Sequence, residues 1–147
     1  MFCYLNKAEK DVWLPKLFAI LQENTPCSPS LTQWLENVSP ALDKVPRQIL
    51  LMFAQGELAG FCQFYTREKM LMIEELQIKK AHQRTLLFCQ FLKHLRSLLP
   101  QELETLEAYA HQDNHPSICL MNRLGLKSQP EPPFLHFSGA IPKFQKA

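Results

Sequence analysis

The sequence predicts a single α/β domain in which a mixed, mostly antiparallel sheet is flanked by helices. The first observation is a set of three apolar, strand-like runs with only short turns between them: 48–54, 58–66 and 70–78. The second is the segment 84–99, where apolar residues recur at helical spacing and stop before Pro100. A chain of 147 residues with no repeat and no long linker suits one domain, 1–147, with one core.

The N-terminal part predicts a strand and then helical structure. Residues 1–5 are short and apolar enough for an opening strand, and 6–22 carry apolar residues at helical spacing. Asn6 fits an N-cap because Glu9 follows three residues later, as in a capping box. Pro15 lies inside the pattern and lacks the backbone N–H that a helix needs. We therefore expect it to break or kink this segment, which would allow two short helices.

A second helix is expected after a loop over 24–30, which is rich in Ser, Thr and Pro. Ser30 fits the N-cap of a helix over 31–38, with Gln33 three residues on as in a capping box. The pair Ser39-Pro40 is expected to lie beyond its end, in a turn-rich stretch.

The three central runs predict an antiparallel meander. Gln55-Gly56 forms the first turn and the charged segment 67–69 forms the second. Downstream, the sequence predicts these elements in order: a strand over 105–110, a helix opened by Asp113-Asn114 with Pro116 in its first turn and Gly125 as its C′ residue, strands over 126–129 and 134–138 around an irregular 130–133, and a loose tail over 142–147.

Composition excludes some classes of function. The net charge of +2 gives no strongly basic face for a nucleic acid. No apolar run approaches the roughly 18 residues of a membrane helix, and the N-terminus lacks the apolar region of a signal peptide. We therefore expect a cytoplasmic protein with no nucleic-acid or membrane partner.

The five cysteines are scattered and show no metal-ligand spacing. Cys62, Cys89 and Cys119 stand among apolar neighbours, so we expect them to be buried, reduced thiols. The five histidines show no metal spacing either, and no metal is expected.

The junction between the 70–78 strand and the long helix has the composition of an anion site. Lys79, Lys80, His82 and Arg84 give it positive charge. A helix N-terminus adds free backbone N–H groups and a favourable dipole, both of which suit phosphate. The alternative is a solvated basic turn with no ligand.

Two motifs resemble those of the GCN5-related N-acetyltransferases (GNAT proteins). The run 73–78, Ile-Glu-Glu-Leu-Gln-Ile, followed by Gln83, resembles the central strand and the start of the Gln/Arg-x-x-Gly-x-Gly/Ala acetyl-CoA loop. Asn114-x-x-Ser117-x-x-x-Met121-x-x-x-Gly125-Leu126 is similar to the family pattern Asn-x-x-Ala-x-x-x-Tyr-x-x-x-Gly-Phe in every spacing. With the strands between 48 and 65, the resemblance covers most of the chain.

This resemblance implies an acetyl-CoA site in a cleft where the 70–78 and 105–110 strands splay apart. The strand backbone would bond the acyl arm and the turn would hold the pyrophosphate. The residues that it assigns to the donor are Leu76, Gln77, Ile78, Gln83, Arg84, Thr85, Leu86, Leu87, Phe88 and Asn114. Asn114 also fits a helix N-cap, the role we favour.

The sequence departs from the family at three positions. Leu86 and Phe88 stand where the family keeps glycine and glycine or alanine, which let a phosphate approach the backbone. Phe88 either rotates into the core or fills the pyrophosphate position. Met121 replaces a tyrosine that often protonates the leaving thiolate, and methionine has no proton to give.

Glu74 and Glu75 are the candidate catalytic residues. The acceptor amine must lose a proton before it attacks a thioester, and a carboxylate can take it directly or through water. Strand alternation places the two side chains on opposite faces unless a β-bulge intervenes. We assign the base to Glu75, with Glu74 next; the alternative is a solvated or ion-paired glutamate. Packing is the favoured role of four aromatic residues: Trp13, Trp34, Tyr65 and Tyr109.

The resemblance thus predicts an acetyl-CoA-dependent N-acetyltransferase that acts on a small-molecule or protein amine, and it allows a homodimer. The rival is a non-catalytic GNAT-fold protein that binds a partner or ligand, since the glycine-rich loop and the tyrosine are missing. A transferase that uses another acyl donor is a third interpretation.

Overall fold

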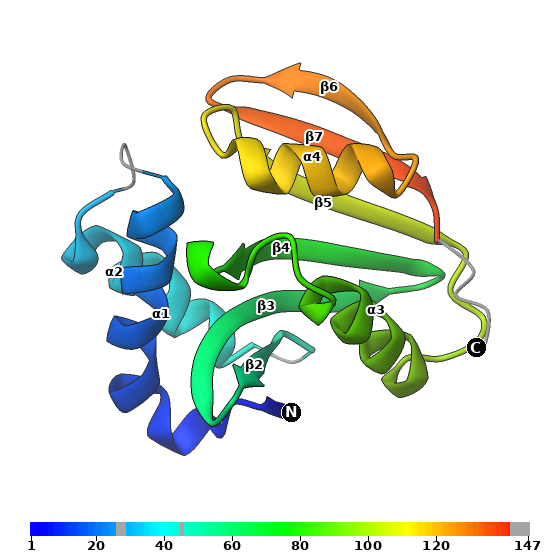
Figure 1. Cartoon of the computed structure of the whole chain (residues 1–147). Coiled ribbons are helices and arrows are strands. Elements are labelled where there is room, and N and C mark those ends of the chain that lie inside the picture. Colours follow the sequence, from blue (N-terminus) through cyan, green and yellow to red (C-terminus); the bar gives the residue numbers. More distant parts are fainter. Residues whose placement is uncertain (26–28, 45, 142–147) are drawn as a thin grey trace.

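The computed structural model describes residues 1–25, 29–44 and 46–141 (Figure 1). Its sheet has the strand order β1-β2-β3-β4-β5-β7-β6. All neighbouring strands are antiparallel except β4 and β5, which run parallel. The strands are β1 (Phe2–Tyr4), β2 (Gln48–Ala54), β3 (Glu57–Arg67), β4 (Met70–Ile78), β5 (Thr105–His111), β6 (Lys127–Glu131) and β7 (Phe134–Ala140). The predicted mixed, mostly antiparallel sheet flanked by helices is confirmed.

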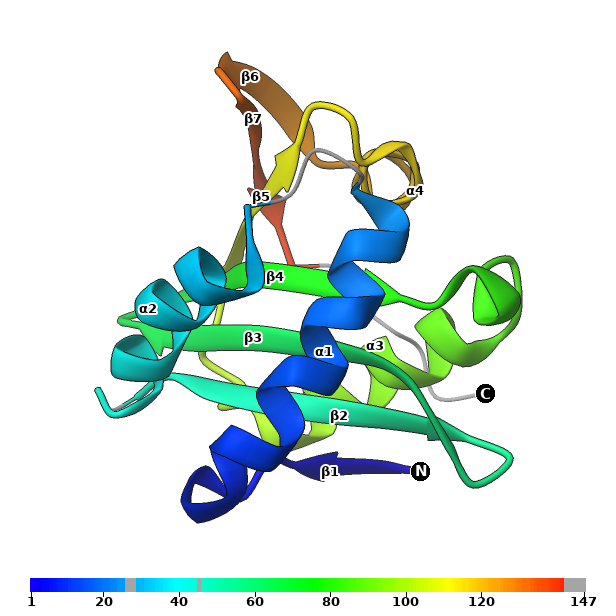
Figure 2. The same cartoon turned by 90° about the vertical axis from the view of Figure 1, so that its left-hand side faces the viewer.

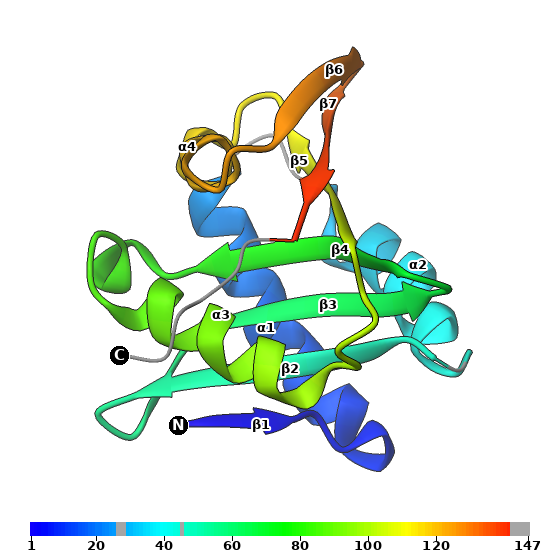
Figure 3. The same ribbon diagram turned by 90° about the vertical axis from the view of Figure 1, so that its right-hand side faces the viewer.

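Helices cover both faces of the central strands. They are α1 (Lys10–Asn24), α2 (Leu31–Leu42), α3 (Leu87–Leu98) and α4 (His115–Arg123), with short 3-10 turns at Lys7–Glu9 and Lys80–His82. Figure 2 shows α1 and α2 lying across one face of β2, β3 and β4. Figure 3 shows α3 on the opposite face.

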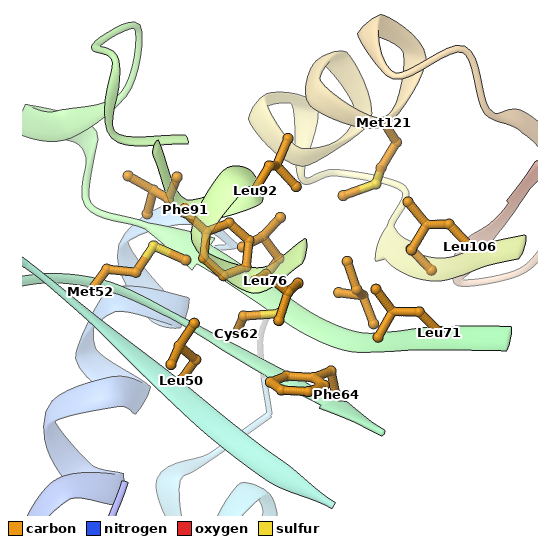
Figure 4. Packing of buried hydrophobic residues seen from close by; sticks show 14 of the residues in the cluster. Leu50, Met52, Cys62, Phe64, Leu71, Leu76, Phe91, Leu92, Leu106 and Met121 are labelled. Atoms are coloured by element: carbon orange, nitrogen blue, oxygen red, sulfur yellow. The ribbon is translucent and has the colours of Figure 1, made fainter. Parts of the chain in front are cut away.

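The core therefore has two layers, one on each face of the sheet. The α1 and α2 layer buries Leu14, Leu17 and Trp34 against β2 and β3. The other layer packs Phe91 of α3 and Met121 of α4 against Leu76 (Figure 4). β4 and its neighbours β3 and β5 all contribute apolar side chains to this second layer.

The structure confirms two helix N-caps and one hairpin turn that the sequence predicted. Ser30 and Gln33 form a reciprocal capping box at the start of α2. Gln55 and Gly56 both have positive φ, at 55° and 79°, as expected for a tight hairpin turn whose backbone twist matches the strands. Asn114 caps α4 by accepting a hydrogen bond from the Ser117 backbone N–H.

The prediction that Pro15 divides the first helix is wrong, because α1 continues through it. Pro15 cannot donate to the carbonyl of Asp11, but the helix buries Leu14 and Leu17 completely. This burial outweighs one missing hydrogen bond. For the same reason α2 runs through Pro40 and ends at the buried Leu42 rather than before Ser39.

Two further boundaries differ from the predicted ones. The long helix begins at Leu87 instead of Arg84, because Arg84 has φ of 64°, which a right-handed helix cannot include. The segment 130–133 is only partly irregular, since Pro130 belongs to β6. Proline is tolerated there because β6 is an edge strand.

The cysteine prediction holds for one residue of three. Cys62 is buried and free, whereas Cys89 and Cys119 are free but exposed. Apolar sequence neighbours misled the prediction, because adjacent residues in a helix face different directions. The loop residues 26–28, with Cys27, and the tail 142–147 lie outside the described part of the chain.

Across the described ranges, no helix is both long and apolar enough to cross a membrane. In the same part of the chain, no three His, Cys, Asp or Glu side chains are grouped as metal ligands.

Candidate functional site

The site is built where β4 and β5 part. Their parallel pairing runs from Met70 opposite Thr105 to Ile73 opposite Ala108, and ends there. Beyond that point the two strands diverge, as Figure 1 shows. The splay that the sequence resemblance predicts beside the long helix is therefore present.

A β-bulge in β4 coincides with the splay. Gln63 of β3 lies opposite Glu75, and the next residue, Phe64, lies opposite Ile73, so Glu74 is an extra residue in β4. A bulge re-aims the side chains around it. Glu74 and Glu75 consequently line the same cavity, and simple alternation onto opposite faces is corrected here.

This cavity has a volume of about 440 Å³. It extends through the splay from the α2 side of the sheet to α4. Its walls include residues from α2, β3, β5, α4 and β7: Trp34, Gln63, Tyr109, Ser117, Met121 and Phe134. A volume of this size is in the usual range for small-molecule sites.

Glu75 has a raised pKa. Burial raises the pKa of Glu75 to about 7, a hydrogen bond from the Gln77 side chain opposes the rise, and the negative charge of Glu74 adds to it. The group therefore exchanges its proton near neutral pH.

Glu74 has a different environment. Its Oε1 lies 2.9 Å from Nε of Arg47 and accepts a longer hydrogen bond, 3.4 Å, from Nε2 of Gln63. The ion-paired interpretation left open by the sequence thus applies to Glu74 and not to Glu75.

A buried amide network fills the base of the splay. Oε1 of Gln77 accepts hydrogen bonds from Nδ2 of Asn24, at 3.0 Å, and from Nδ2 of Asn114, at 3.3 Å. All three side chains are less than 10% exposed. Gln77, which the resemblance assigns to the donor site, therefore joins α1 and α4 to β4 and orients Glu75.

The edge of β4 that faces the splay is covered by side chains of the same chain. The Leu76 carbonyl accepts a hydrogen bond from Oγ of Ser117 at 3.2 Å. The Ile78 carbonyl accepts from Nδ2 of Asn24 at 2.8 Å and from Nε2 of Gln83 at 2.9 Å. In an extended strand the N–H and C=O of one residue point to the same edge. The N–H groups of Leu76 and Ile78 therefore face the splay as well.

At the start of α3, the large side chains of Leu86 and Phe88 point away from the backbone of the preceding turn. Leu86 is 72% exposed. Phe88 is half-buried and packs against the core, with its ring centroid 6.3 Å from that of Phe91. Of the two arrangements that the sequence allowed for Phe88, the structure has the one in which the ring turns to the core.

The same turn is basic and partly self-capped. Lys80 and Arg84 are exposed, and Lys79 and His82 are half-buried. Oγ1 of Thr85 accepts a hydrogen bond from the Leu87 N–H at 3.2 Å, which satisfies one amide of the first helical turn.

Met121 lies in the wall of the cavity and is 2% exposed, with its side chain directed into the core (Figure 4). It offers no proton. Trp34 and Trp13 pack as expected, Trp34 in the core and Trp13 against Phe53 with ring centroids 6.0 Å apart.

Tyr65 and Tyr109 each pack against a neighbouring side chain and also line a hollow. Tyr109 stacks on His136 with centroids 4.5 Å apart, and Tyr65 lies under the guanidinium of Arg47. Both also line a second hollow of about 390 Å³ that shares Glu74 and Glu75 with the cavity. Sequence reasoning missed Arg47 and Asn24, since no motif marks either residue and their partners on β4 lie far along the chain.

No protein-family model matches this sequence. No curated protein sequence matches it either.

Solved structures do resemble it. A PaiA N-acetyltransferase from Thermoplasma acidophilum, in complex with coenzyme A, superimposes with a TM-score of 0.71 at 12% identity, over 95% of this chain and 98% of the other. A GNAT-family acetyltransferase from Staphylococcus aureus Mu50 gives 0.71 at 9% identity over 97% and 99%. The ribosomal-protein-S18-alanine N-acetyltransferase of Escherichia coli gives 0.68 at 16% identity over 99% and 96%.

The chain therefore has the GNAT fold, as the sequence resemblance predicted. The strands splay apart where that resemblance expects them to.

Proposed function

We propose that this protein is an acyltransferase that moves an acetyl group from acetyl-CoA to the nitrogen of an amine. The observation that carries the proposal is the bulge at Glu74, which brings Glu75 into a cavity at the point where β4 and β5 part. The likeness to GNAT acetyltransferases supports it, and so does the coenzyme A in one of those structures.

The donor position can be tested on the residues present. The N–H groups of Leu76 and Ile78 face the splay, where an extended acyl arm would add like a further strand. The hydrogen bond from the Ser117 hydroxyl to the Leu76 carbonyl would be exchanged for one from the acyl arm. The basic turn suits the pyrophosphate, because Leu86 points to solvent and Phe88 to the core. The residues therefore fit the group.

Acetyl-CoA, when bound, supplies a thioester carbonyl that an amine can attack. Glu75 takes one proton from the acceptor ammonium, and Gln77 holds the carboxylate in place. The nitrogen then forms a bond to the carbonyl carbon while the carbon–sulfur bond breaks. The sulfur takes the second proton of the acceptor nitrogen, since Met121 has none. One proton is released for each acetyl group transferred.

Binding of the donor is the first test. Calorimetry with acetyl-CoA and with CoA should give saturable heat at micromolar to low millimolar ligand. Absence of heat at millimolar concentration would remove the proposal. Release of free thiol on addition of an amine panel then tests transfer.

The second candidate, a non-catalytic GNAT-fold protein, has one observation in its favour. The Leu76 and Ile78 carbonyls already accept hydrogen bonds from Ser117, Asn24 and Gln83, so these carbonyls of the β4 edge are satisfied without a ligand. A double substitution, Leu86→Gly with Phe88→Gly, separates the candidates. The acyltransferase proposal expects wild-type protein to bind CoA already. Binding that occurs in the double variant alone would favour the non-catalytic protein.

A further inference from the structure

Arg47 contributes a cationic side chain to the wall of the cavity, and no sequence motif predicted this role. It lies between α2 and β2, and its side chain is 28% exposed. Its Nε is 2.9 Å from Oε1 of Glu74, and its Cζ lies 5.3 Å from the centroid of the Tyr65 ring. An ion pair on one side and an aromatic face on the other hold the guanidinium in one orientation.

The outer part of this guanidinium has hydrogen-bonding capacity to spare. A guanidinium carries five N–H donors. Among the described residues, none accepts a hydrogen bond from either Nη atom of Arg47. Arg47 lines the 440 Å³ cavity, so a ligand inside it can contact this side chain. A planar pair of N–H donors is the arrangement that binds a carboxylate with two parallel hydrogen bonds.

Glu75 supplies the opposite charge in the same cavity. Its neighbour Glu74 is neutralised by Arg47, so Glu75 is the carboxylate left to bind an ammonium group. Within the described part of the chain, the cavity thus presents a cation with free donors, Arg47, and a carboxylate that no cation pairs with, Glu75. Between these groups its walls are largely aromatic and apolar, with Trp34, Tyr109 and Phe134 among them.

We propose that the acceptor is an amino acid, meaning a small molecule with both a primary amine and a carboxylate, whose carboxylate binds Arg47 while its amine binds Glu75. This inference rests on the proposed function and narrows its acceptor. An amine without a carboxylate would leave the Nη donors of Arg47 buried under the ligand without an acceptor, and that costs affinity.

The group transfer balances as for any amine. The ammonium gives one proton to Glu75, the nitrogen bonds the acetyl carbon, the thiol of CoA leaves with the second proton, and the product is an N-acetylamino acid. The carboxylate of the acceptor is unchanged and remains on Arg47.

Binding to wild-type protein without any acyl donor gives the main test. The test measures the thermal shift of the protein and its saturation-transfer NMR signal with the standard L-amino acids and with ω-amino acids from β-alanine to 6-aminohexanoate. The best ligand is then compared with its decarboxylated and its deaminated analogues. We expect each analogue to bind about ten- to a hundredfold more weakly, the effect of losing one charge-assisted pair. The inference is overturned if no amino acid binds at about 10 mM, or if the plain amine binds equally well.

Arg47 variants assign the effect to this side chain. Arg47→Met should weaken the amino acid about ten- to a hundredfold and should not weaken the decarboxylated amine, because the freed Glu74 carboxylate also attracts an ammonium group. Arg123→Met, on the exposed face of α4, removes the same charge away from the cavity and should change neither. Arg47→Lys keeps the charge and serves if the Met variant does not fold. An equal loss for both ligands in Arg47→Lys would overturn the assignment.

The outcomes separate this inference from the proposed function. An amino acid that binds through Arg47 to a protein that does not bind CoA would keep the inference and remove the acyltransferase. Transfer to plain amines at the same kcat/KM as to amino acids would keep the acyltransferase and remove the inference.

Discussion

Glu74 and Glu75 are adjacent, have the same chemistry and differ in role because of one inserted residue in β4. Because of the bulge, Glu74 forms an ion pair with Arg47, whereas Glu75 accepts a hydrogen bond from Gln77 and lines the cavity. A buried carboxyl group beside another carboxylate resists ionisation, which raises its pKa. Glu74 is therefore the ion-paired glutamate, and Glu75 is the glutamate with the raised pKa.

The raised pKa of Glu75 predicts a pH-dependent cost to stability. The folded-state pKa is about 7 and the reference value 4.5, so the folded protein holds this proton more tightly than the unfolded chain. The stabilisation that the fold gains from holding this proton is fully present below about pH 4.5 and is lost as pH rises through 7. Glu75→Gln should therefore raise stability at pH 8 by about 3 kcal/mol, or a Tm by roughly 6–12 °C, with little change at pH 4.

Thermal unfolding at the two pH values measures this. Glu74→Gln is the matched control, and we expect it to lower the Tm at pH 8, because it leaves the half-buried Arg47 without its carboxylate. A Tm for Glu75→Gln that falls at pH 8 would show that the Glu75 carboxylate is stabilised in the fold.

Activity should depend on the same protonation of Glu75, but it should rise with pH where stability falls. If Glu75 takes the proton of the amine, kcat/KM rises with pH and levels off above a pKa of about 7. Glu75→Gln should reduce kcat by about 10²- to 10⁴-fold and remove that step from the profile. Initial rates between pH 5.5 and 9 with the best acceptor measure both. A profile unchanged in the variant would assign the proton transfer to another group.

Among the elements, the helices depend on packing more than on local preference. Proline stands inside both α1 and α2, and each helix passes through it because the face that it buries is apolar. In contrast, the start of α3 follows local backbone geometry, since the positive φ of Arg84 delays the helix to Leu87. That delay produces the turn in which Leu86 points to solvent.

Replacing Pro15 should stabilise the protein. Pro15→Ala restores an N–H that can donate to the Asp11 carbonyl, and alanine favours the helix, so we expect a gain of about 1–3 kcal/mol. Pro116→Ala is the matched control, because Pro116 stands in the first turn of α4, where the N–H has no helical partner. Urea unfolding of both variants measures the difference. An equal or larger gain at Pro116 would contradict this account of α1.

At the level of the whole protein, the site exists because two halves of the sheet separate. The meander β1 to β4 is held by α1, α2 and α3, while β5, β6, β7 and α4 form the other part (Figures 1 and 2). The two parts meet in the short parallel pairing of β4 with β5 and in the hydrogen bonds among Asn24, Gln77 and Asn114.

A ligand that fills the splay should therefore tie the two parts together. CoA at a hundred times its Kd should stabilise the folded state by about 2.7 kcal/mol, which corresponds to a Tm increase of roughly 5–11 °C. Differential scanning calorimetry with and without CoA measures it, and ATP at the same concentration controls for a general effect of phosphates on the basic turn. The same increase with ATP would indicate an anion site and no donor groove.

Much of the architecture could be read from local patterns. Apolar runs identified the strands, Ser30 with Gln33 and Asn114 identified two helix starts, and the spacing around Glu74, Glu75 and Gln83 pointed to the GNAT fold. These features depend on residues that lie near one another in the chain. Their physical cause, a cap or a periodic apolar face, is complete within one segment.

The remaining features required the folded chain, because each depends on residues that meet only after folding. The bulge is a property of the register between β3 and β4, and Arg47 reaches Glu74 across an intervening strand. Asn24 bonds Gln77 from 53 residues away. The continuity of α1 through Pro15 and the exposure of Cys89 and Cys119 follow from which face of each helix is buried. Residue order alone thus determined the elements and their family likeness. Which glutamate titrates, and which cation shares its cavity, depended on packing between segments far apart in the chain.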